Sequence, residues 1–132
     1  MNDYREYFDE VIEAHRQIEQ WFAGPQPPAV VENLLMRFSP QFSMITPAGR
    51  FMDFEQLGEL FRKAGGARIG LRIELCEMHG IDLHERGATL SYRELQNDAT
   101  GLQTDRRSTV VFEKLESGQV VWRHLHETFC PA

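Results

Sequence analysis

Hydrophobic positions recur at helical spacing in the first half of the chain and alternate at strand spacing in the second half. Between residues 3 and 23 the apolar side chains return every three or four positions, which is the period of one buried helical face. Gly24 ends this predicted helix, and a shorter helix follows over residues 29–37. The apolar face of the first helix consists of Tyr4, Phe8, Val11, Ile12, Ile18 and Phe22, with His15 on the same face.

A short strand pair and a third helix follow. Residues 38–53 predict a strand, a turn at residues 47–49 and a short return strand. Asp53 and Gln56 form the capping-box pattern, which predicts that a helix begins here and ends at Gly65.

Four segments with strand alternation make up the rest of the chain. They cover residues 68–79, 82–96, 106–116 and 119–129, and the last two form a hairpin around Ser117-Gly118. Helices followed by an antiparallel meander predict an α+β fold, with the N-terminal helices packed on one face of a curved, mostly antiparallel sheet. At 132 residues the chain is predicted to be a single domain, residues 1–132.

Composition narrows the class of protein. A net charge of −6 with scattered basic residues argues against a nucleic-acid binder. Neither a signal-peptide pattern nor an apolar run of membrane-spanning length is present, so no membrane partner is expected. Cys76 and Cys130 fit neither a disulfide framework nor a metal-ligand spacing, which predicts free thiols in the reducing cytoplasm.

Several segments together resemble the nuclear transport factor 2-like (NTF2-like) superfamily, whose members have a cystatin-like α+β cone. They are the first helix ending at Trp21, FSMITPAGR, YRELQ, STVVFEK and the closing WRHLHETF. The similarity covers nearly the whole chain and extends to small bacterial polyketide-cyclase-like (SnoaL-like) proteins and to the association domain of calmodulin-dependent kinases. It implies a conical pocket between sheet and helices, and homodimers formed through the sheet.

The resemblance does not decide the function, because the superfamily includes a steroid isomerase, cyclases, dehydratases and transport adaptors. In the isomerase branch a catalytic aspartate precedes the proline of the first strand-turn, and the matching residue here is Thr46. Threonine cannot act as a general base near neutral pH, which argues against isomerase chemistry of that kind.

The closing hairpin can be divided into two faces by parity. A two-residue turn would pair Val110 with Leu125 and Phe112 with Arg123. A longer turn or a bulge would instead flip one strand. The predicted inner face holds Ser108, Val110, Phe112, Arg123, Leu125, Glu127 and, at its end, Arg106, whereas the outer face holds Trp122, His124 and His126.

The predicted ligand-binding residues lie on the inner face. Arg123 and Glu127 would form either a structural ion pair at the floor of the pocket or direct ligand contacts. Tyr92 and Glu94 from the neighbouring strand would add polar groups, and Trp21 would pack beside or line the cavity.

The histidines have two interpretations each. His15 is either a core side chain or a general base at the pocket mouth. His124 and His126 form an H-x-H pair that lacks further metal ligands, so no metal or other cofactor is expected. With Trp122 they would instead pack against a second subunit, giving a homodimer.

Three functions remain open from the sequence. The first is a small-molecule-binding protein for an unknown, partly apolar ligand. The second is a cofactor-independent cyclase, dehydratase or isomerase that uses His15 or Glu127 as acid or base. The third is a dimerisation module whose interior is filled.

Overall fold

The computed structural model describes residues 3–131, and the helices precede the long strands as the pattern predicts. Among these residues no helix is long and apolar enough to cross a membrane. The elements are α1 (Arg5–Ala23), α2 (Pro28–Leu35), β1 (Phe38–Ile45), β2 (Phe51–Asp53), α3 (Phe54–Lys63), β3 (Arg72–His84), β4 (Gly87–Asn97), β5 (Gln103–Lys114) and β6 (Val120–Phe129).

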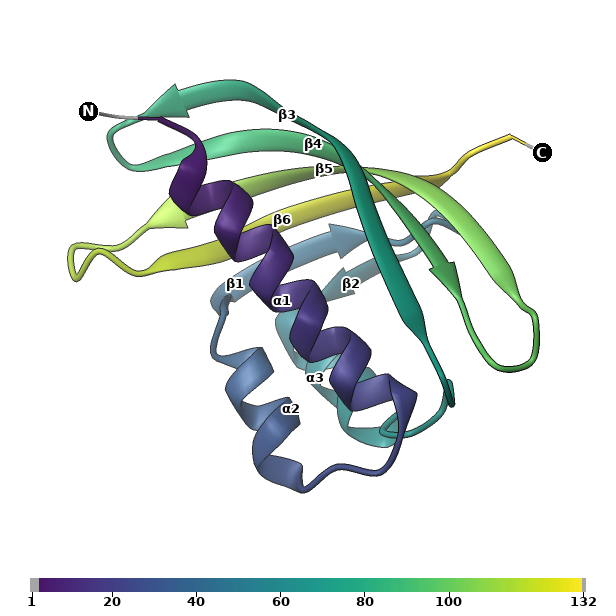
Figure 1. Cartoon of the computed structure of the whole chain (residues 1–132). Coiled ribbons are helices and arrows are strands. Elements are labelled where there is room, and N and C mark those ends of the chain that lie inside the picture. Colours follow the sequence, from purple (N-terminus) through teal and green to yellow (C-terminus); the bar gives the residue numbers. More distant parts are fainter. Residues whose placement is uncertain (1–2, 132) are drawn as a thin grey trace.

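The strands form one curved sheet in the order β2-β1-β6-β5-β4-β3. All neighbours pair antiparallel except β1 and β6, which are parallel. The sheet curls around α1, while α2 and α3 lie beside α1 at the end of the molecule near β1 and β2 (Figure 1). This arrangement confirms the predicted α+β cone.

Two local predictions fare differently. The capping box is present, since the Asp53 side chain accepts from the Gln56 amide and the Gln56 side chain accepts from the Asp53 amide, both at 2.9 Å. The bounds of the next two strands were wrong. Gly70, at a φ of +73°, turns the chain before β3, and a tight turn at residues 85–86 separates β3 from β4.

The turn of the closing hairpin is one residue longer than predicted. The Leu115 amide donates to the Gln119 carbonyl, so three residues rather than two connect the strands. Gly118 adopts a φ of +93°, the left-handed conformation that three-residue hairpin turns favour at this position. The longer turn shifts the pairing of the strands by one residue.

A β-bulge at Arg123 reverses this shift. Phe112 pairs with Trp122, but the next residue, Val111, pairs with His124, which leaves Arg123 as the extra residue. The pairing from His124 onward is therefore the predicted one.

The predicted faces of β6 need two corrections as a result. Trp122 is not on the outer face; it points inward and is only 2% exposed. Arg123 does not point inward; its Nη1 donates to the carbonyl of Gln41 at 2.6 Å. Leu125 and Glu127, beyond the bulge, are buried on the inner face as predicted.

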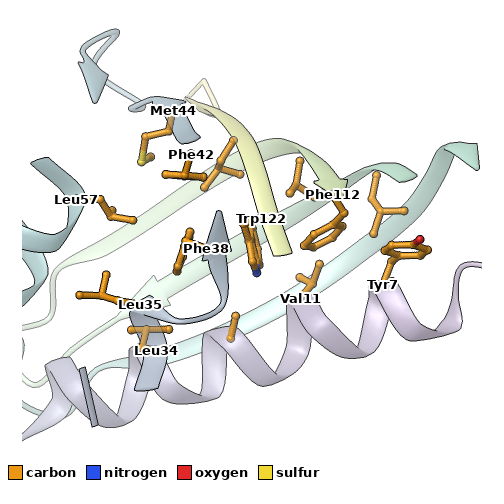
Figure 2. Close-up of a cluster of buried hydrophobic side chains, with 14 of the residues drawn as sticks. Tyr7, Val11, Leu34, Leu35, Phe38, Phe42, Met44, Leu57, Phe112 and Trp122 are labelled. Atoms are coloured by element: carbon orange, nitrogen blue, oxygen red, sulfur yellow. The ribbon is translucent and has the colours of Figure 1, made fainter. Parts of the chain in front are cut away.

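Trp122 lies at the centre of the hydrophobic core. Figure 2 shows its ring between Phe38 and Phe112, with ring centroids 5.7 and 4.9 Å away. Its indole N–H donates to Glu10 of α1 at 3.0 Å, so a single side chain connects the sheet to the helix. The large ring and its satisfied N–H explain why the interior requires tryptophan here.

Candidate functional site

A cavity of about 300 Å³ remains between α1, α3 and the concave face of the sheet. It lies on one side of the Trp122 core, and most of its wall is apolar. Thr46 and Pro47 contribute to it from the turn after β1. The apolar wall consists mainly of Ile18, Phe22, Phe38, Phe42, Met44, Met52, Leu57, Phe61, Leu71, Trp122 and Leu125.

A connected set of polar side chains lines the opposite side of the cavity. His15 Nε2 lies 3.1 Å from Glu94 Oε1, and Gln96 Nε2 donates to Glu94 Oε2 at 2.5 Å. The side-chain oxygen of Gln96 (Oε1) accepts from Arg68 Nη1, and Arg68 Nε donates to Asp98 at 3.0 Å. Because β4 alternates, Glu94 and Gln96 share its inner face and can both take part.

Glu127 stands beside this set on β6. One of its oxygens accepts from Ser108 Oγ at 3.2 Å and the other lies 3.5 Å from Arg106 Nη1. Ser108 pairs directly with Glu127 across β5 and β6, and Arg106 pairs with Glu94 across β4 and β5. The sheet register therefore brings both carboxylates and the arginine to one side of the cavity.

His15 and Glu94 form a buried ion pair. Burial by itself would lower the pKa of His15, but the charge and hydrogen bond of Glu94 outweigh it, and the pKa of His15 is raised. His15 Nδ1 donates to the Val11 carbonyl at 2.7 Å, so both ring nitrogens face acceptors, as an imidazolium requires. Burial by itself would raise the pKa of Glu94. His15 and then Arg106 outweigh burial and hold the pKa of Glu94 below its ordinary value.

Glu127 has the opposite behaviour. Burial is the main cause of its raised pKa, and the negative charge of Glu94 adds to the effect. Arg106, His15 and Ser108 only partly offset this. Two carboxyl groups on one cavity wall thus have pKa values moved apart, the arrangement by which proteins separate a charged group from a proton-carrying group.

The His15 shift predicts a free energy of unfolding that falls as pH rises above 6.5. Because the pKa of His15 is higher in the folded protein than its ordinary value of 6.5, the ion pair contributes its full stabilisation below pH 6.5. That stabilisation is lost as the pH rises through the pKa of His15 in the folded protein. Urea unfolding between pH 6 and 9 should show a loss on the order of 1 kcal/mol per unit of pKa difference. The variant His15→Gln should lack the loss of stability that comes from deprotonation of His15. A wild-type stability that rises over this pH range would contradict the His15–Glu94 ion pair.

The structure brings some of the sequence-predicted site residues together and separates others. His15, Glu94 and Glu127 line the cavity. Tyr92 is buried with its ring edge against His15 but does not line the cavity. Trp21 is also outside the lining, because its indole N–H donates to the Phe61 carbonyl at 2.7 Å and fixes α3.

Other cavity residues were not among the ligand-binding residues predicted from the sequence. Arg123 lies outside the cavity for the reason given above, and Arg106, which the parity placed only at the end of the inner face, is the arginine beside Glu127. Arg68 was assigned to a strand, although it lies in the loop before β3. Gln96 carried no signal beyond its even position on β4, which it shares with Glu94.

The outer face of the sheet carries the remaining histidines. His124 Nδ1 lies 2.8 Å from Ser43 Oγ, and His126 is exposed. Within residues 3–131 no three His, Cys, Asp or Glu side chains are grouped so that they could hold a metal ion. A hollow of about 340 Å³ lies along this face, lined in part by Glu77, Arg107 and His126.

Comparisons with known proteins place the chain in a family. A scan of protein families and a search of curated proteins find no match. Among solved structures, an NTF2-like protein of unknown function from Pseudomonas aeruginosa is 46% identical, with a TM-score of 0.90, over 95% of this chain and 98% of its own.

Two more distant structures are similar in fold alone. The calmodulin-dependent kinase II hub homology domain from Chlamydomonas reinhardtii has a TM-score of 0.76 at 16% identity, over 99% of this chain and 100% of its own. A ketosteroid isomerase-like protein from Erwinia carotovora has a TM-score of 0.66 at 10% identity, over 94% of this chain and 93% of its own. The Pseudomonas similarity, close over almost the full length of both proteins, shows that this chain belongs to the NTF2-like family.

Proposed function

We propose that the protein binds a small, partly apolar molecule in the cavity between α1, α3 and the sheet. The observation that carries the proposal is the combination of an apolar wall with a buried, hydrogen-bonded polar side formed by His15, Glu94 and Glu127. Small-molecule sites have this composition, and about 300 Å³ is at the lower end of their size range. The proposal requires no cofactor, and the two free cysteines suit a reducing cytoplasm.

The polar side has a cost that ligand binding would explain. Buried charged groups reduce stability unless they are fully paired, and a filled apolar core would be the simpler solution for a purely structural domain. In this protein the charged groups border an open cavity instead of a filled core. This favours binding over the alternative of a dimerisation module without a ligand.

Calorimetric titration with hydrocinnamyl alcohol, a neutral aromatic probe with one polar end, tests the proposal. The variant Leu60→Trp should weaken binding by about tenfold or more, because Leu60 lines the cavity, is 48% exposed and would place an indole across the opening. Leu115→Trp, at an exposed position outside the lining, is the matched control. Equal binding by both variants, or no binding to the wild type by this alcohol or by charged probes of the same shape, would reject the proposal.

A second candidate function is proton transfer by Glu127. The separated pKa values of Glu94 and Glu127 favour it, since a carboxyl with a raised pKa is a stronger base than an ordinary one and can return the proton it takes. In the simplest reaction the Glu127 carboxylate removes a proton from the carbon beside a ketone, and the resulting enolate takes a proton back from the carboxyl group.

Hydrogen exchange measures this reaction. In D₂O, benzylacetone should exchange the hydrogens beside its carbonyl faster with the protein than without it, followed by proton NMR. Glu127→Gln should lower the catalysed rate by about 100-fold or more, the usual contribution of a general base. Glu116→Gln, at an exposed position in the hairpin turn, should have no effect. A rate unchanged in Glu127→Gln excludes Glu127 as the base.

We also propose a homodimer through the outer face of the sheet, around His124 and His126. The burial of Trp122 removes the aromatic residue that first suggested this interface. What supports it now is the hollow along the face, beside the exposed Thr109 and His126.

Sedimentation velocity should therefore give twice the chain mass of 15.3 kDa. Thr109→Arg, which adds a charged side chain at the centre of the face, should shift the protein to monomer. Gln20→Arg, on the exposed side of α1, should leave it dimeric. A wild-type monomer at high concentration would contradict the proposal.

A further inference from the structure

Arg106 is the most weakly satisfied charged group of the cavity. Its guanidinium carries five N–H donors and lies over the ring of Phe129, 5.4 Å from the centroid. Its hydrogen bonds within residues 3–131 are two long ones, 3.5 Å to Glu127 and 3.3 Å to the Thr104 hydroxyl. Its Nε is buried and has no hydrogen-bond partner within residues 3–131. Because its side chain is only 15% exposed, water supplies few of the missing partners. A largely buried arginine with unsatisfied N–H donors is a group to which an incoming hydrogen-bond acceptor could bind.

Arg68 has a related deficit nearby. Its Nε and Nη1 are bonded to Asp98 and Gln96, but its Nη2 is buried and has no partner within the described part of the chain. Gln96 pairs with Thr104 across β4 and β5, so both arginines approach the same end of these two strands. Two cationic side chains with spare donors thus border one end of the cavity.

The surrounding charges do not satisfy these donors. Glu94 is already engaged by His15 and Gln96. Glu127 directs one oxygen to Ser108 and reaches Arg106 only at 3.5 Å. Much of the remaining cavity wall, by contrast, is apolar and includes Phe42, Met44 and Trp122.

We propose, building on the binding function above, that the ligand is a carboxylic acid in its anionic form with an apolar tail. Its carboxylate accepts hydrogen bonds from Arg106 and Arg68, and its tail lies against the aromatic wall. Arginine and carboxylate form charge-assisted hydrogen bonds that are stronger than those to a neutral group. A carboxylate also brings a negative charge to the two arginines, which an alcohol cannot do.

Three probes of nearly equal shape test this class by calorimetric titration: hydrocinnamate, hydrocinnamyl alcohol and phenylpropylammonium. Hydrocinnamate should bind about tenfold or more tightly than the alcohol, because a hydrogen bond to a charged partner adds on the order of 1.5 kcal/mol or more. The ammonium compound should bind least. Arg106→Gln should abolish the preference for hydrocinnamate while leaving the affinity for the alcohol within about twofold.

Arg107→Gln is the matched control, because Arg107 is the neighbouring arginine on the outer face and contacts Glu77. If Arg106→Gln does not fold, Arg106→Lys keeps the charge and should retain part of the preference. Alcohol that binds as tightly as hydrocinnamate overturns the carboxylate proposal but leaves the binding function standing. Failure of all three probes to bind the wild type counts against both proposals.

Discussion

Replacing Trp122 by alanine should lower the free energy of unfolding by about 3–5 kcal/mol, the usual cost of removing a large aromatic side chain from a core. Trp122 is almost fully buried between Phe38 and Phe112, and its N–H bond to Glu10 would also be lost. Replacing its neighbour Arg123 by alanine should cost only about 1 kcal/mol, since one hydrogen bond to a backbone carbonyl is removed. Urea unfolding of both variants measures the difference.

This pair of substitutions tests the bulge directly. Without the bulge, the shorter turn first predicted would put Arg123 inside and Trp122 outside, and the two costs would be reversed. A loss below about 1 kcal/mol for Trp122→Ala, together with a large loss for Arg123→Ala, would therefore show that the register of β6 is wrong.

Removing Glu94 alone should be nearly as damaging, at about 3 kcal/mol or more in Glu94→Leu. The substitution leaves His15 in a buried site without its carboxylate, and it removes the acceptor of Gln96. The double variant His15→Leu with Glu94→Leu should be more stable than Glu94→Leu alone, because leucine at position 15 replaces a buried polar ring that has lost its hydrogen-bond partner.

A double-mutant cycle by urea unfolding at pH 6 gives the coupling energy of the pair. The two single losses should sum to clearly more than the double loss, and the excess should shrink at pH 9, because deprotonation of His15 in the wild type weakens the ion pair. Strict additivity at pH 6 would mean that His15 and Glu94 do not form the ion pair.

The order of elements was predictable because each follows from local rules. Helical spacing, the Asp53 capping box and strand alternation all act within a few residues, and they gave the helices and the strands of the sheet. Strand ends were less certain. The turn at residues 85–86 consists of two charged residues, Glu85 and Arg86, and only Gly87 directly after it indicates a break in the alternating pattern.

The inner face of β6 was predictable only in part. Leu125 and Glu127 follow from simple alternation, but Trp122 and Arg123 depend on a longer turn and on a bulge that offsets it. Neither leaves a signal in the strand pattern. The packing of Trp122 against Phe38 of a parallel neighbour decides the matter, and such a contact joins residues far apart in the chain.

The polar residues of the cavity were likewise predictable only in part. Glu94 was predicted because its strand neighbours alternate, and Glu127 because of its parity on β6. Arg68 reaches the cavity from an irregular loop, where no period indicates the direction of a side chain. Its role depends on Gln96 and Asp98, which the sheet brings close to it only in three dimensions.

The central claim is that the cone holds an open cavity that accepts a small molecule. A crystal structure of the protein grown with hydrocinnamyl alcohol tests it most directly. The account predicts electron density for the probe inside the cavity, with its ring near Trp122 and its hydroxyl within hydrogen-bond distance of the polar side chains lining it. A structure in which those side chains close the space, with the probe absent from the interior at saturating concentration, would contradict it.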